Sequence, residues 1–283
     1  MIETTIDSAG TRVRRGDGFA KLWAVFVRDS NLAFSYDINF WLQWVGCFVE
    51  IGIVYLIGSL VPPSPKFGFD GRPHPYFGYL ITNIAFLRFQ TVAVSAFALA
   101  IRDAQTFGTL EIVLSTPTSL SFIVLSSGAY AFSFQLVQTL LILVIATFLG
   151  LDVSHINVLT FVVFVLLMIA AVAPIGVIAA SATMVFKKSG PVEFFLTSMT
   201  QLFGGVYIPV KSLPLLLQPI GMLIPVAHAL NGLRGGLEGA SLAQLWPDVA
   251  WLCGLSLVFV PISLWLFSAA VNRAKHDGTL GQY

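Results

Sequence analysis

The amino-acid sequence predicts an all-α polytopic membrane protein with six transmembrane helices. Of its 283 residues, 57% are hydrophobic and only 10% are charged, whereas a soluble globular protein carries about 25% charged residues. The mean hydropathy is +0.86. Apolar runs of roughly 20 residues, the length that a helix needs to cross the hydrocarbon core, recur along the chain. Lipid is therefore the expected solvent for most of the protein.

The chain divides into a polar N-terminal tail at 1–18, a transmembrane domain at 19–271 and a cytoplasmic C-terminal tail at 272–283. The N-terminal tail contains three arginines, and no apolar core follows it at once, so we do not expect a cleaved signal peptide. Residues 19–34 place apolar side chains at helical spacing, with Lys21, Arg28 and Asp29 interrupting them. This pattern predicts an amphipathic helix that lies along the membrane interface.

The six spans are expected at about 38–61, 77–101, 120–149, 158–186, 191–207 and 246–271. The "VPPSP" string at 61–65 ends the first span, because proline cannot continue a helix. The fifth apolar segment is marginal in length. After it, Pro209, Pro214, Pro219 and Pro225 divide the chain into pieces too short to span. Such short apolar segments favour a re-entrant helical hairpin between spans five and six.

The distribution of basic residues predicts the orientation. With a cytoplasmic N-terminus, ten lysines and arginines flank the inner side, and four flank the outer side: Lys66, Arg72, Lys211 and Arg234. Positively charged loops favour the cytoplasm, so both termini are expected inside a cell inner (plasma) membrane.

A short polar segment, "FGTLEIVLSTPTS" at 107–119, interrupts the apolar chain between spans two and three. In the predicted topology it lies in a cytoplasmic connection. A short helix there would offer its surface either to water or to another protein. The residues alone leave an ordinary solvated loop equally open.

Two strings resemble the hallmarks of one family. "GTLEIVLSTPTS" at 108–119 is similar to the signature that follows span two in the ABC-2 family of ABC-transporter permeases. "GGVYIPVKSLPLLLQPIGMLIPVAHALNGLR" at 204–234 is similar to the family's proline-rich re-entrant hairpin on the outer side. The two strings match in order and in spacing, and the six-span plan covers almost the whole chain.

The resemblance implies that 107–119 holds a cytoplasmic coupling helix, which sits in a groove of a separate nucleotide-binding ATPase subunit. The implied coupling residues are Gly108, Thr109, Leu110, Glu111, Thr116 and Pro117. The helix at 19–34 would be the family's connecting helix, and the four prolines would mark an outer gate. The chain contains no G-x-x-x-x-G-K-[ST] phosphate-binding loop. We therefore expect ATP and Mg²⁺ to be bound by the partner ATPase, and a second permease copy, most simply identical, to complete the transporter.

The implied function is that of a permease subunit of an exporter rather than an enzyme. Hydrophobic or amphipathic cargo, drug or lipid-like, is the first expectation, and polysaccharide or lipid-linked glycan is the alternative. An ion-coupled transporter or channel is a weaker alternative. The four histidines are scattered and the two cysteines lie in apolar runs, so no metal site and no catalytic motif is expected. The net charge of +1, without a basic stripe, gives no reason to expect nucleic acid.

Several polar residues lie inside the predicted spans. Glu50 and Arg88 each stand about 12 residues, roughly 18 Å, from the loop that joins spans one and two. They could therefore pair, or one or both could face a substrate path. Gln90, Gln135, Gln138 and Gln201 also lie in apolar surroundings. Hydrogen bonds between helices are the favoured interpretation for these glutamines, with pore lining as the alternative.

Overall fold

The computed structural model describes residues 22–23, 26–28, 30–31, 37–68, 72–106, 120–186 and 190–276. Within these residues the regular secondary structure is helical, apart from one isolated antiparallel bridge between Ser64 and His74. The predicted all-α class is confirmed.

Five helices among the described residues are long and apolar enough to cross a membrane. They are α2 (Asp37–Leu60), α3 (Tyr76–Thr106), α5 (Leu120–Phe148), α6 (Val158–Phe186) and α10 (Trp246–His276). Together they make the chain a multi-pass membrane protein. The expected fifth span is helical only over α7 (Gly190–Phe203), which has 14 residues. At 1.5 Å per residue this is about 21 Å, less than the roughly 30 Å of a hydrocarbon core.

Local sequence explains where the long helices end. α2 stops before Pro62 and Pro63. At the end of α5, Gly150 adopts a φ of +106°, a conformation that residues with a side chain rarely adopt. The amide of Leu151 then donates to the carbonyl of Ala146 at 2.9 Å. α6 begins at an N-cap, because the side-chain oxygen of Asn157 accepts from the amide of Thr160 at 3.1 Å.

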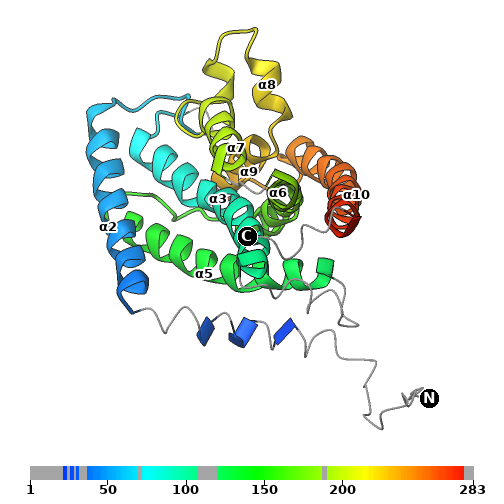
Figure 1. Ribbon diagram of the computed structural model, residues 1–283. Coiled ribbons are helices and arrows are strands. Elements are labelled where there is room, and N and C mark those ends of the chain that lie inside the picture. The colour runs from blue at the N-terminus through cyan, green and yellow to red at the C-terminus, as the bar shows by residue number, and fades with distance from the viewer. Residues whose placement is uncertain are drawn as a thin grey trace, which may run out of the picture.

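α3 and α6 form the centre of the bundle. α3 contacts α2, α5, α6, α7 and α9 (Pro225–Leu237), while α2 and α10 lie at opposite edges (Figure 1). Phe86 and Phe89 of α3 and Phe164 of α6 are fully buried in the core between them. Within the candidate spans, 67% of the α3 window is buried, against 22% for α2 and 11% for α10. The two outer helices therefore expose most of their apolar surface, as lipid-facing helices do.

One end of the bundle, here called the hairpin end, carries residues 204–245 together with the connections at 61–68 and 149–157. The segment holds a single 3₁₀ turn, η1 (Val210–Ser212), and two short helices, α8 (Gln218–Leu223) and α9. In Figure 1, α8 projects at this end, opposite the helical pieces of residues 22–31. Two of these segments are joined directly, because the amide of Asn157, just before α6, donates to the carbonyl of Gly236 in α9 at 2.8 Å.

The prolines divide this segment as the sequence predicts. Pro209 precedes η1, Pro219 lies in the first turn of α8, and Pro225 begins α9. The carbonyl of Pro214 accepts from the amide of Leu217 at 2.8 Å in the turn before α8. Each piece is too short to span a bilayer. A re-entrant position in the membrane and a gating role stay predictions.

The described residues between 22 and 31 are helical, as expected for the connecting helix. Phe26 stacks on Trp23, and its ring meets the edge of Tyr130 of α5 with 5.8 Å between centroids. This segment therefore packs against α5. Its position at a membrane interface stays a prediction.

Candidate functional site

One face of α3 carries four polar side chains, Tyr76, Tyr79, Asn83 and Gln90, here called the α3 clamp. At 100° per residue they fall within an arc of about 60°. All four donate to backbone carbonyls of α7 or of residues 204–209, here called the connection, which joins α7 to η1.

Asn83 and Tyr79 form the centre of the clamp. The side-chain amide of Asn83 is fully buried and donates to the carbonyls of Gly205 and Val206, at 3.1 and 3.0 Å. The hydroxyl of Tyr79 donates to the same Gly205 carbonyl. Gly205 has a φ of +75°, which glycine adopts without strain, and this turn ends the path of α7.

Tyr76 and Gln90 extend the clamp on either side. The hydroxyl of Tyr76 donates to the carbonyl of Tyr207 at 2.7 Å, and the amide of Gln90 donates to the carbonyl of Leu196 in α7 at 3.2 Å. The carbonyls of Gly205, Val206 and Tyr207 lie in non-helical backbone, where no helical ladder supplies a donor, and leaving one unsatisfied in an apolar medium costs several kcal/mol. The clamp supplies these partners from a single rigid helix.

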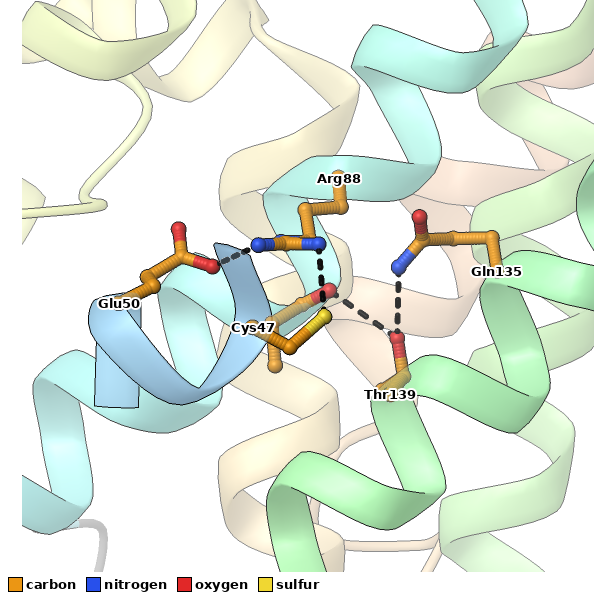
Figure 2. Close-up of polar contacts among 6 residues, drawn as sticks. Cys47, Glu50, Arg88, Gln135 and Thr139 are labelled. Atoms are coloured by element: carbon orange, nitrogen blue, oxygen red, sulfur yellow. Dashed lines mark hydrogen bonds and ion pairs between the residues drawn. The ribbon is translucent and has the colours of Figure 1, made fainter. Parts of the chain in front are cut away.

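Glu50 and Arg88 pair, as their similar depth in the spans allowed. One terminal nitrogen of Arg88 in α3 forms an ion pair with Glu50 Oε2 in α2, and the other lies 3.3 Å from the Sγ of Cys47 (Figure 2). The two charged side chains are 26% and 30% exposed. Arg88 therefore joins α3 to the outer helix α2, on a different face from the α3 clamp.

The glutamines differ in what they contact. Gln135 donates to Thr139 Oγ1 one turn along α5 at 3.1 Å, and Thr139 donates to the carbonyl of Ala85 in α3 at 3.2 Å (Figure 2). Gln135 thus reaches α3 through Thr139, whereas Gln90 bonds to α7 directly. Among the described residues, Gln138 is buried with its amide nitrogen unpartnered, and Gln201 is half-buried on α7.

A histidine–aspartate contact joins α9 to the first turn of α10. His228 Nδ1 lies 2.6 Å from Asp248 Oδ1, and His228 Nε2 lies 2.8 Å from the carbonyl oxygen of Met222. Asn231 donates to the second Asp248 oxygen at 2.7 Å. Both neighbours of the ring can accept hydrogen bonds, and this arrangement favours the protonated imidazole, in which both ring nitrogens donate. Burial lowers the pKa of His228, but the bonds from Asp248 and Met222 outweigh it and raise the pKa above its ordinary value.

The coupling residues expected from the sequence, Gly108, Thr109, Leu110, Glu111, Thr116 and Pro117, lie outside the described residues. The structure shows where the segment is attached: α3 ends at Thr106 and α5 begins at Leu120. The helix that carries the α3 clamp therefore directly precedes residues 107–119 in the chain.

Comparison with known families identifies the chain. The family model described as "ABC-2 type transporter" matches residues 23–237, well over half of the sequence. The chain belongs to the ABC-2 type transporter family. A search among curated proteins found no match. ABC-2 membrane domains are permease components, so the chain is a component of a membrane permease.

The sequence predicted that Gln90 bonds to another helix, as it does, but other polar contacts of this ABC-2 permease were missed. The α3 clamp left a detectable signal, because its members recur at offsets of 3, 7 and 14 residues within an apolar span. His228 and Asp248 left none, since they lie 20 residues apart on different helices. The sequence predicts Arg234 only as a charge in an outer loop, whereas its guanidinium carbon lies 4.4 Å from the ring centroid of Tyr79.

Proposed function

We propose that this chain is the permease subunit of an ATP-driven exporter and, with a second copy, forms the path for a hydrophobic or amphipathic molecule. Membership of the ABC-2 family supports the assignment. A separate subunit would bind ATP and Mg²⁺, since the sequence has no phosphate-binding loop of its own. If α7 and the connection together count as a sixth span, both termini would lie in the cytoplasm of an inner-membrane protein and the hairpin end outside, an orientation that the distribution of basic residues supports.

The observation that carries the mechanism is the continuity of α3. This helix has 31 residues, and its last residue, Thr106, leads directly into the segment at 107–119. Asn83 lies 23 residues earlier, about 35 Å along the helix axis. A movement imposed by the ATPase on 107–119 would therefore reach the connection through one helix. The α3 clamp would convert it into a movement of the backbone that leads to Pro209 and the proline-divided gate.

Export would then proceed by alternating access. ATP binding brings the two ATPase subunits together, each coupling segment moves with its subunit, and α3 carries the displacement to the hairpin end. The cavity between the two permease copies opens outward as the gate segments part. The pieces of the gate are short and joined by non-helical residues, so they can move without breaking a spanning helix.

The partner is tested first. The chain is extracted in mild detergent from its host and affinity-purified unchanged, with Glu111→Arg, or with Asp152→Arg. Asp152 is an exposed carboxylate in the connection between α5 and α6, at the hairpin end, which makes its reversal a charge-matched control. We expect an ATPase subunit to accompany the unchanged chain and the control, and to be lost with Glu111→Arg. Absence of an ATPase from the unchanged chain would contradict the proposal.

The proposed transmission of movement through α3, here called the relay, is tested without knowing the cargo. With both native cysteines replaced, a cysteine at Leu215, which is 83% exposed at the hairpin end, is labelled by an impermeant maleimide with and without ATP. We expect ATP to change the labelling rate. Asn83→Ala should remove this ATP dependence while leaving the ATPase bound, whereas Gln138→Ala, a buried change outside the clamp, should preserve it. Equal behaviour of the two variants would refute the relay.

A further inference from the structure

A cavity of about 390 Å³ lies at the hairpin end, within the roughly 300–1,000 Å³ typical of small-molecule sites. Four segments contribute to its wall: the loop after α2, the connection with η1, the α8–α9 pair and the first turn of α10. It is separate from the Glu50–Arg88 pair and from the gate prolines other than Pro209.

Positive charge predominates among the described residues that line this cavity. Lys66, Lys211 and Arg234 are cationic, and the carboxylate among them is Asp248. That carboxylate is already engaged by His228 and by an asparagine amide. Three lysine and arginine side chains against one engaged carboxylate leave positive charge in excess at this cavity.

The arginine is held in place. Its Nε donates to the carbonyl of Leu230 at 3.1 Å, and its guanidinium carbon stands over the ring of Tyr79 at 4.4 Å. A half-buried guanidinium fixed in this way is pre-organised for an oxyanion. The two lysines are exposed at the rim on separate segments, where flexible ammonium groups can close on an anion from two sides.

The remaining wall is apolar and lies near the ends of the spans. Phe67, Val210 and Met222 line it beside the charged groups. The candidate spans end at Leu60 and begin at Tyr76 and Trp246 at this same end of the bundle. A ligand here would meet cationic groups at the level of the lipid head groups and apolar side chains beside them. That combination suits a molecule with an anionic head and a hydrocarbon tail.

We propose that this cavity binds the phosphate head group of an amphipathic molecule. Lys66, Lys211 and Arg234 neutralise the phosphate, and the apolar wall contacts the part of the hydrocarbon tail next to the head group. A cleft in which one sign of charge predominates concentrates counter-ions, so the site recruits such molecules from the membrane surface or holds them on the way through. Binding requires neither an ATPase nor transport, so this proposal can fail while the permease assignment stands.

The test measures binding to the purified full-length chain in detergent by isothermal titration. Three probes are compared: dioctanoyl phosphatidic acid, dioctanoylglycerol, which has the same tails without the phosphate, and inorganic phosphate. Each is titrated into the unchanged chain, Lys66→Gln, Lys211→Gln and Arg273→Gln. Arg273 is an exposed cation near the other end of α10 and serves as the charge-matched control. Size-exclusion profiles and thermal unfolding check that every variant is folded.

We expect phosphatidic acid to bind most tightly and each lysine variant to bind it about fivefold more weakly, the loss of one partly exposed charge contact. Arg273→Gln should leave the affinity unchanged. Equal affinity for dioctanoylglycerol would show that the phosphate is not recognised and would overturn the proposal. Inorganic phosphate binding as tightly as phosphatidic acid would identify a free-anion site and overturn the amphipathic part. Equal weakening by the control would mean that only overall charge matters, which also refutes the site.

Discussion

Replacing Asn83 with alanine tests whether the α3 clamp holds the connection. The side chain is fully buried and donates two hydrogen bonds, at 3.1 Å to Gly205 and 3.0 Å to Val206. A neutral hydrogen bond contributes about 1 kcal/mol net, so removing two costs about 2 kcal/mol, or about a 30-fold change in the folding equilibrium. The Gly205 carbonyl keeps its bond from Tyr79, which prevents a larger loss.

Reversible unfolding in mixed dodecylmaltoside–SDS micelles, followed by tryptophan fluorescence, measures the free energy of unfolding. Asn272→Ala, at an exposed position of α10, is the matched control and should change stability by less than about 0.5 kcal/mol. Asn83→Asp preserves the size of the side chain but removes its N–H donors, so it should destabilise at least as much as alanine. A stable aspartate variant, or an alanine variant no weaker than the control, would refute the clamp.

Three further predictions concern other contacts. Gly205→Ala should destabilise the protein by about 1–2 kcal/mol, because its φ of +75° is disfavoured for residues with a side chain; Gly46→Ala, with open space around the new methyl group, should not destabilise it. The contact of His228 with its aspartate should stabilise the fold fully below pH 6.5, the ordinary pKa, and this contribution should be lost as the pH rises through the raised pKa of the folded state. Unfolding of the unchanged chain and of His228→Gln across pH 5–9 checks this, and an unchanged pH dependence in the variant would contradict it. Glu50→Ala and Arg88→Ala should each destabilise the protein, and the double variant should lose less than their sum by about 1–2 kcal/mol; additivity in a double-mutant cycle would exclude a stabilising pair.

The long helices could be predicted from the sequence because each apolar run has its own stop signal. The fourth span was expected at 158–186, and α6 occupies Val158–Phe186. The last was expected at 246–271, and α10 continues to His276. Glu50 and Arg88 could be matched in depth because both lie at a countable distance from the same loop. Predicting the depth of residues in α2 and α3 thus required only helix geometry and the expectation that lipid surrounds the spans.

The contacts of the hairpin end could not be predicted in the same way. A side chain that donates to a backbone carbonyl has no particular residue type as its partner, so nothing in the sequence links Asn83 to Val206. α7 stops short of a span because the chain turns at Gly205. Asn83 of α3 stabilises this turn by donating to the Gly205 carbonyl, which is a tertiary contact that the local sequence does not reveal. The cationic cavity is likewise built from segments far apart in the chain. From the sequence alone, its lysines predict only which side of the membrane their loops occupy.

The pairing of Glu50 with Arg88 also constrains how the protein is made. Glu50 emerges from the ribosome 38 residues before Arg88, so for that interval α2 carries a carboxylate near the middle of its apolar stretch without the arginine that pairs with it. Inserting α2 alone would place that carboxylate in hydrocarbon, at a cost of a few kcal/mol. We therefore expect the two helices to enter the bilayer most favourably as a pair. The arginine that joins the finished helices would thus also set the order of their membrane integration.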